Sequence, residues 1–396
     1  MELALYDPAV GYYARAAQRS GRAGDFFTSV DVGPLFGELL ATQIAEMATI
    51  LQSTAEPAKH GEKEFISANS ASSAVSAFDL VEAGAGNGRL SADILRAVRD
   101  RHPDLYPQVR LHLVEASAAA RDAQLATLGD VRDRLSSAGG LLPESFEGVL
   151  VANELLDAFP VHQVVMRENG LKEVYVVDAP KREGGQPRDR GPALRQAQGI
   201  PSLPRDERAA LHTIEGPPST PALQEYIDRL GITLEPGWRV EINLRAVDWI
   251  RDAAQRLARG FIILIDYGHE ARDLYSASHA QGTLTTFSGH RTDVAQGAAP
   301  WLVHPGEQDI TAHVDFTSVR DAAEAAGLTT IAFLDQTYFV LGLVSAWNEA
   351  ALAERARALK TLLVPGGLGS THKVMIFGKA VGTPALLGCS FGVRVT

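Results

Sequence analysis

The sequence has a single cysteine and comparatively few basic residues. Cys389 has no second cysteine with which to form a disulfide inside the chain, so a reducing compartment is expected. The 37 Lys and Arg residues are outnumbered by 48 Asp and Glu residues, which gives a formal net charge of −11 at pH 7. This balance argues against a broad surface for nucleic acid or for anionic membranes.

Long apolar runs are also missing. No stretch approaches the roughly 20 apolar residues that a membrane-spanning helix needs. Residues Met1 to Ala4 carry neither the basic region nor the apolar core of a signal peptide. We therefore expect a cytoplasmic protein with no membrane insertion. A chain of 396 residues, 45% of them hydrophobic, can form one large domain with additions.

Sequence patterns of metal ligands are absent as well. No histidine pair combines the i, i+4 spacing of a helical metal site with a third ligand nearby, so no metal site is predicted. His269 and His290 fall in loops near the expected site, where a structural hydrogen-bonding role is favoured over that of a general base. The scattered histidines are His162, His269, His290, His304, His313 and His372.

What the sequence does contain is an alternation of helical and strand patterns. Apolar residues recur at helical spacing over 34–51, and short apolar runs separated by helical segments follow. This alternation predicts an α/β fold with a doubly wound, mostly parallel sheet. The expected elements of this first half are strands at 78–83, 111–115 and 146–152 and helices at 90–98 and 118–128.

The pattern changes after residue 160. A hairpin is expected over 164–177, with Asn169-Gly170 at its turn, followed by a loop over 179–221 rich in Pro, Gly, Arg and Asp. Helices are then expected at 246–257 and 314–326, and strands at 261–265, 329–333, 338–343 and 373–377. The predicted divisions are an N-terminal lid and helical segment (1–51), a flexible insertion (52–77), the first half of the core (78–160), an inserted hairpin and loop (161–240) and the second half of the core (241–396).

The most informative stretch lies at 79–90, where an apolar run and the carboxylate Glu82 precede Gly84, Gly86 and Gly88. Glycines at such a strand-to-helix turn let backbone N–H groups approach a ligand closely. A dinucleotide site would have the spacing G-x-G-x-x-G, whereas here the third glycine comes one position early. The spacing instead resembles the first motif of S-adenosylmethionine (SAM) methyltransferases, with Glu82, Gly84, Ala85, Gly86 and Gly88 as cofactor-binding candidates. A glycine-rich turn without a ligand is the alternative.

A second carboxylate, Glu115, ends the next expected strand. In this position it can accept both ribose hydroxyls of a nucleoside, each such bond contributing roughly 1.5–3 kcal/mol. The alternative is an exposed strand end with no ligand.

Further polar residues follow the strands at 146–152 and 261–265. Asn153, Glu154 and Asp157 come after the first, and Asp266 ends the second. Asn153 is predicted to bind the cofactor, and Glu154, Asp157 and Asp266 to serve catalysis. The segment from Asn153 lacks the N-P-P-Y pattern of nucleic-acid amino-methyltransferases, and a carboxylate suits a cationic acceptor such as a guanidinium better. The alternative for Glu154 and Asp157 is capping of a following helix.

Blocks along nearly the whole chain resemble the MidA-like (DUF185) family of SAM-dependent methyltransferases. Mitochondrial members of this family act in the assembly of respiratory complex I. The matching blocks are 4–8 with 11–13, 24–29 with 34–37, 82–90, 153–161, 266–268, 289–291 and the most idiosyncratic, 305–316. The resemblance implies a Rossmann-like class I methyltransferase core, SAM as cofactor and symmetric dimethylation of arginine on a protein, with a complex I core subunit as the expected type of partner. The oligomeric state is left open, with a homodimer as one alternative.

The resemblance also implies site roles. It places Glu154 on the acceptor side, Glu82 or Glu115 as the acid of the SAM loop, and the block Gly24, Asp25, Phe26 and Thr28 as a lid over the methionine end of SAM. Family members usually have a helix before the first block, so either the start is truncated here or this member lacks that helix. Open alternatives are a methyltransferase for a small molecule or a non-arginine acceptor, and an assembly chaperone that binds SAM with little turnover.

Overall fold

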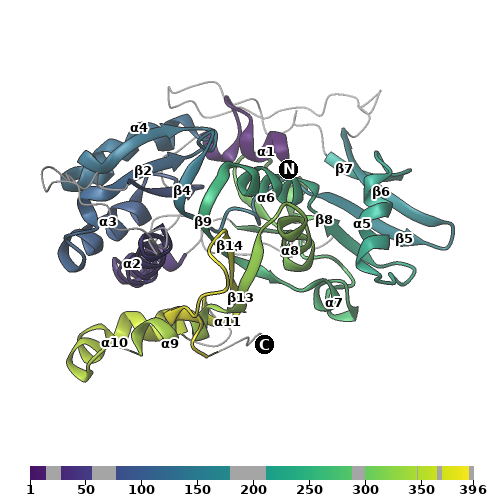
Figure 1. Ribbon diagram of the computed structural model, residues 1–396. Coiled ribbons are helices and arrows are strands. Elements are labelled where there is room, and N and C mark those ends of the chain that lie inside the picture. The colour runs from purple at the N-terminus through teal and green to yellow at the C-terminus, as the bar shows by residue number, and fades with distance from the viewer. Residues whose placement is uncertain are drawn as a thin grey trace, which may run out of the picture.

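The computed structural model describes residues 1–14, 28–55, 77–178, 211–287, 299–345, 347–363 and 368–391. Its centre is an eight-stranded sheet, in which β2, β4, β9, β14 and β13 can be followed in Figure 1. The strand order is β13-β14-β9-β4-β1-β2-β3, with β12 pairing beside β9. The strands are β1 (Phe78–Ala83), β2 (Val109–Val114), β3 (Leu135–Gly139), β4 (Phe146–Asn153), β9 (Leu257–His269), β12 (Val314–Asp315), β13 (Thr329–Asp335) and β14 (His372–Lys379).

Strands β3, β2, β1, β4 and β9 run parallel, whereas β14 is antiparallel to both β9 and β13. The chain winds from β1 to β2 and β3 on one side and then returns to place β4 on the other side of β1. In open α/β sheets a ligand binds beyond the carboxyl ends of the strands where the winding reverses. The topology therefore directs attention to the ends of β1, β2 and β4.

Helices cover both faces of this sheet. Alternate residues of β1 face opposite ways, since Leu80 packs in one apolar cluster and Val81 in the other. The first cluster is covered by α2 (Leu35–Ala55), α3 (Arg89–Arg101), α9 (Gln336–Val344) and α10 (Glu349–Leu363), and the second by α5 (Ala222–Leu230), α6 (Leu244–Arg256) and α8 (Phe316–Ala325). The result is a three-layer α/β/α core, which confirms the predicted fold class.

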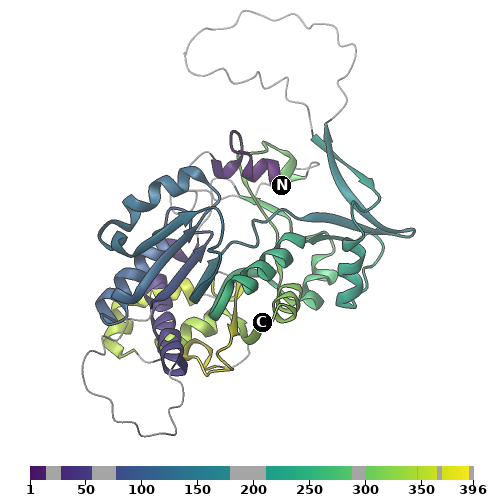
Figure 2. The same cartoon turned by 45° about the horizontal axis from the view of Figure 1, so that its top comes forward.

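Smaller elements are added to the core. An antiparallel sheet in the order β7-β6-β5-β8 extends away from the central sheet (Figure 2). It consists of β5 (His162–Arg167), β6 (Gly170–Asp178), β7 (Leu211–Gly216) and β8 (Arg239–Ile242). The remaining elements include α1 (Glu2–Tyr6), α4 (Ala118–Leu128), α7 (Ala271–Leu274), α11 (Leu368–Thr371) and the pair β10 (Thr285–Phe287) and β11 (Asp309–Thr311).

Several expectations for single elements were wrong. Residues 338–343, predicted as a strand, belong to the helix α9, which is buried and apolar and therefore shows no helical periodicity. The end of the expected 179–221 loop contains β7. In the hairpin, Arg167 pairs with Gly170, so the turn residues are Glu168 and Asn169.

Two further predicted segments cannot be compared with the structure. The flexible insertion falls mostly on 56–76 and the loop mostly on 179–210, outside the described residues. The division of the chain into segments stays a prediction. Among the described helices, none is both long and apolar enough to cross a membrane.

Candidate functional site

The turn between β1 and α3 has the backbone conformation that its glycines permit. Gly84, Gly86 and Gly88 have φ angles of 74°, 51° and 83°, a region that side chains with a Cβ rarely adopt. At Gly86 a Cβ would meet no atom within 4 Å, so the backbone there borders open space. Gly88 begins α3 at its N-cap. The turn therefore brings peptide groups close to whatever occupies that space.

A cavity of about 350 Å³ lies beside this turn, and its volume falls in the usual range of small-molecule sites. Its wall comes from the ends of β1, β2 and β4, as the topology indicates, and from the N-terminal residues. Of the predicted site residues, those that line it are Thr28, Glu82, Gly84, Ala85, Gly86, Glu115, Asn153 and Glu154. Gly88, Asp157 and Asp266 lie outside the lining, and Gly24, Asp25 and Phe26 lie outside the described residues.

Glu115 lies at the cavity wall just after β2. Its Oε2 accepts a hydrogen bond from the Gly86 N–H at 2.8 Å, and its Oε1 accepts one from the Ser117 N–H at 2.7 Å. Both bonds keep the carboxylate at the glycine turn. This is the position that the sequence predicts for a ribose ligand, and the ribose role stays a prediction.

Glu82 lines the same cavity, but its side chain is hydrogen-bonded to the first turn of α3. Its Oε2 accepts hydrogen bonds from both the backbone N–H and the hydroxyl of Ser91. Burial raises the pKa of Glu82 to about 8, although the bonds from Ser91 oppose the rise, and Glu115 and Asp93 add to it. Glu82 therefore fixes the start of α3 to the end of β1, and any contact with a ligand comes in addition to that role.

Two buried side-chain oxygens near the turn lack a hydrogen-bond partner in the part of the chain that the structure describes. Oδ1 of Asn153 and Oε1 of Gln124 have no hydrogen-bond partner among the described residues, although each side chain donates through its nitrogen. The Asn153 side chain lines the cavity, and Gln124 Nε2 donates to the Gly86 carbonyl at 2.9 Å. Unpaired buried acceptors are costly, so a bound donor would stabilise Asn153. Together with the turn and Glu115, this arrangement fits a nucleoside cofactor.

Glu154 has the least relaxed backbone at the site. Its φ is 50°, an uncommon value for a residue other than glycine, and its N–H donates to the Ile265 carbonyl at 2.8 Å. Its side chain is 14% exposed and lines the cavity. Asn153 Nδ2 donates to Glu154 Oε1 at 3.3 Å, and His372 Nε2 lies 3.6 Å from the same oxygen. The strained backbone thus presents a carboxylate to the cavity.

Asp266 lies behind the turn that carries Glu154. Its Oδ2 accepts from the N–H groups of Leu155, Leu156 and Asp157 at 3.2, 2.8 and 3.4 Å. Burial raises the pKa of Asp266 well above its usual value, and the carboxylate of Asp157 adds to the rise. These contacts assign Asp266 to holding the turn, and direct participation in catalysis stays a prediction.

Asp157 is also buried, directly beyond the same turn. Burial raises its pKa to about 7, with Glu154 and Asp309 adding to the rise, while the Tyr267 hydroxyl and His372 oppose it. Its backbone carbonyl accepts a hydrogen bond from the Ala312 N–H at 3.0 Å. The side chain caps none of the described helices, and its predicted catalytic role remains untested.

Aromatic side chains complete the wall of the cavity and were not predicted as site residues. Tyr6 and Tyr13 come from the N-terminal segment, and Phe159 and Trp249 pack edge to face with centroids 6.3 Å apart. The Tyr6 hydroxyl donates to the Ala158 carbonyl at 3.0 Å, which connects α1 to the turn after β4. The only sequence signal for the two tyrosines was that they lie in blocks 4–8 and 11–13, which resemble the family. Trp249 lies within the amphipathic pattern of α6, which gives no sign of a site.

Comparisons with known proteins agree with this geometry. Residues 39–334 match the family model described as "Putative S-adenosyl-L-methionine-dependent methyltransferase". The mouse mitochondrial protein arginine methyltransferase NDUFAF7 is 29% identical over 350 residues, which cover 82% of this chain and 65% of that protein. The Drosophila melanogaster homolog is 27% identical over 353 residues, covering 83% and 66%. The chain thus spans just under two thirds of these relatives' length.

A solved structure is similar over almost the whole chain. It is a Burkholderia thailandensis protein with S-adenosyl-homocysteine bound, 27% identical, with a TM-score of 0.76 over 99% of this chain and 89% of that one. The family model matches most of the chain. The glycine turn, the cavity and the sheet order agree with it, since they form the cofactor site expected of such a methyltransferase. The chain therefore belongs to this family of S-adenosyl-L-methionine-dependent methyltransferases, and SAM is its cofactor.

Proposed function

We propose that the protein methylates arginine side chains of a protein substrate. The observation that carries the proposal is the Glu154 carboxylate, which a strained backbone holds at the wall of the cofactor cavity. Strained residues persist where the surrounding structure over-determines them, and they are frequent at functional sites. A carboxylate in that position can accept two N–H bonds from a guanidinium and hold one nitrogen toward the cofactor.

The composition of the cavity wall supports a cationic acceptor. The wall includes the carboxylates of Glu115 and Glu154, and its basic member, Arg89, forms an ion pair with Asp31 at 3.0 Å. Aromatic faces favour the planar guanidinium further through cation–π contacts. The side chains available for such contacts are Tyr6, Tyr13, Phe159 and Trp249.

The proposed chemistry needs little beyond positioning. SAM supplies a methyl group on a sulfonium sulfur. Glu154 would orient the acceptor nitrogen and accept the proton that this nitrogen loses as its bond to carbon forms, with His372 close behind the carboxylate. Asp266 would keep the Glu154 turn in place through its three backbone hydrogen bonds.

The relatives' names support a protein acceptor, since both the mouse and the fly protein are called protein arginine methyltransferases. At identities of 27–29% this support is suggestive for arginine. We extend the proposal to a respiratory complex I core subunit as the first acceptor to test, and to symmetric dimethylation as the product. A cytoplasmic location and a homodimer likewise remain part of the proposal.

The test is to incubate the full chain with methyl-labelled SAM and a lysate from cells deleted for this protein. Acid hydrolysis of the labelled band should release methylated arginine, and peptide mass spectrometry should locate it. Label on lysine, on a carboxylate or on a small molecule would contradict the arginine acceptor while leaving the methyltransferase family intact.

Glu154→Gln is the matching test of mechanism. The amide keeps the size of the side chain but loses the negative charge that pairs with a guanidinium. We expect nearly normal affinity for S-adenosylhomocysteine and a transfer rate lower by about 100-fold or more, because a misplaced acceptor costs roughly that factor. Glu168→Gln, at the exposed hairpin turn, is the control and should keep full activity. A parallel loss of cofactor affinity would identify Glu154 as a cofactor ligand, and unchanged transfer would remove its proposed role.

A further inference from the structure

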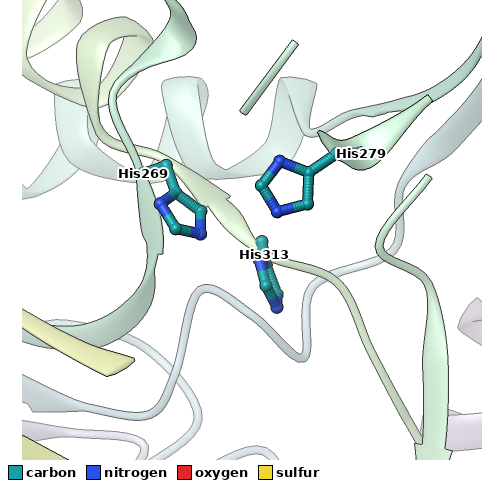
Figure 3. Close-up of side chains that lie close together, drawn as sticks. All are labelled: His269, His279 and His313. Carbon is teal, nitrogen blue, oxygen red and sulfur yellow. The ribbon is translucent and has the colours of Figure 1, made fainter. Parts of the chain in front are cut away.

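Three histidines meet outside the cofactor cavity. His269 ends β9, His279 ends a short 3₁₀ helix (Ala277–His279), and His313 lies between β11 and β12. Figure 3 shows their rings gathered around one space, and one nitrogen from each lies within 4.8 Å of the others. We propose that these three imidazoles bind a divalent transition-metal ion of the zinc class.

The spacing of the rings fits a shared ion. The ring centroids are 4.9 Å apart for His269 and His279, 5.4 Å for His269 and His313, and 5.8 Å for His279 and His313. Around a tetrahedral ion with Zn–N bonds of about 2.1 Å, ring centroids lie about 5 Å apart and the bound nitrogens about 3.4 Å apart. Small rotations of the side chains would therefore bring the nitrogens into bonding distance without moving the backbone.

One ligand is already oriented for this role. His279 Nδ1 lies 3.0 Å from the carbonyl oxygen of Asp273, to which only an N–H can donate. The proton is therefore on Nδ1, and Nε2 carries the lone pair that a metal needs. A backbone carbonyl behind a ligating histidine is a common outer contact of protein metal sites.

His313 provides a second, independent observation. Its Nδ1 is buried and has no hydrogen-bond partner among the described residues. Buried ring nitrogens without a partner are unfavourable. A metal ion would satisfy them.

The ion would join segments that are far apart in the sequence. Strand β12 pairs with the end of β9 through Val314 with Gly268 and Asp315 with His269, so the cluster lies where the small β10–β11 sheet reaches the core. The three side chains are only partly buried, which leaves a fourth position open to water or another small ligand. The sequence prediction of no metal site relied on spacing along one helix, which cannot reveal ligands from three separate segments.

The test uses the full chain, stripped of metal with a chelator and then titrated with Zn²⁺ or Co²⁺. We expect one ion per chain, the visible absorption of Co²⁺ in a tetrahedral nitrogen site and a rise in Tm on Zn²⁺ binding. His279→Ala and His313→Ala should each weaken binding by more than about 100-fold, since loss of an outer partner alone costs 10–100-fold. His212→Ala, on an exposed position of β7, is the matched control and should bind as the wild type does.

Binding of S-adenosylhomocysteine by each variant shows that it has folded, because none of the three histidines lines the cofactor cavity. Retention of Co²⁺ absorption in the His279→Ala/His313→Ala double variant would overturn the proposal. So would a wild-type chain that folds and binds S-adenosylhomocysteine but shows neither Co²⁺ absorption nor a Zn²⁺-dependent Tm.

Discussion

At the scale of single residues, the carboxylates near the cofactor cavity differ chiefly in what surrounds them. Glu115 accepts two backbone N–H bonds at the cavity wall, Glu82 is buried against Ser91, and Asp266 accepts three N–H bonds from the turn that follows Glu154. Glu154 instead has a side-chain amide and an imidazole beside it. The sequence placed all four at strand ends. Only the contacts around each carboxylate show whether it is placed to bind a ligand or to hold the backbone in position.

Glu115→Ala tests the predicted ribose contact. Removing a charge-assisted bond to a hydroxyl costs roughly 1.4–3 kcal/mol, so the Kd for SAM should rise by about 10- to 150-fold. Calorimetry with SAM measures this directly. Glu144→Ala, which removes an exposed carboxylate next to β4, is the control and should leave the Kd unchanged.

The Tm of Glu115→Ala without ligand shows whether weaker binding comes from loss of the ribose contact or from disorder of the glycine turn. The substitution also removes the hydrogen bond that Gly86 donates, so a large fall in Tm would trace weak binding to a disordered turn. A Kd equal to that of the wild type would mean that another residue holds the ribose.

At the scale of elements, helices and strands were predicted correctly where residues close together in the sequence determine them. Strand β1 and helix α4 have the predicted bounds, and α3 begins next to the predicted residue, because their apolar spacing and the glycine turn fix them locally. Helix α9 was mistaken for a strand because burial on all sides removes periodicity. Strand β7 exists only by pairing with β6 across an intervening segment, and the histidine cluster likewise depends on long-range contacts.

The same dependence on long-range contacts appears where β14, β13 and α9 meet. Lys373 Nζ donates to Asp335 Oδ1 at 2.5 Å and to the Ser370 carbonyl at 2.9 Å, and both charged side chains are 1% exposed. Lys373→Met leaves the Asp335 carboxylate buried without its cation. The free energy of unfolding should therefore fall by about 3–5 kcal/mol, measured by urea denaturation.

A double variant makes this prediction specific to the ion pair. Replacing both partners, as in Lys373→Met with Asp335→Leu, removes the uncompensated charge and should restore most of the lost stability. If the double variant were less stable than Lys373→Met alone, the loss would come from packing around β14 instead of from an unpaired charge.

At the scale of the whole molecule, acidic groups accumulate at the carboxyl ends of the central strands in a chain whose net charge is already −11. Burial raises the pKa values of Glu82, Asp157 and Asp266 there. A carboxyl group with a higher pKa in the folded state binds its proton more tightly when folded. Its contribution to stability is therefore complete below the unfolded pKa and is lost as the pH rises through the folded pKa.

Glu82 allows this pH dependence to be measured. Its pKa rises from 4.5 to about 8, and each unit corresponds to about 1.4 kcal/mol, so the full effect is roughly 5 kcal/mol. Glu82→Gln keeps an oxygen for Ser91 but has no proton to lose. Without ligand, the wild type should lose stability relative to Glu82→Gln as the pH rises from about 4.5 to about 8, measured by urea denaturation at both ends of that range. Groups common to both proteins cancel in the difference. Parallel stability curves would show that the carboxyl group of Glu82 titrates alike in the folded and unfolded chains, and that its burial at the cofactor turn has no cost at neutral pH.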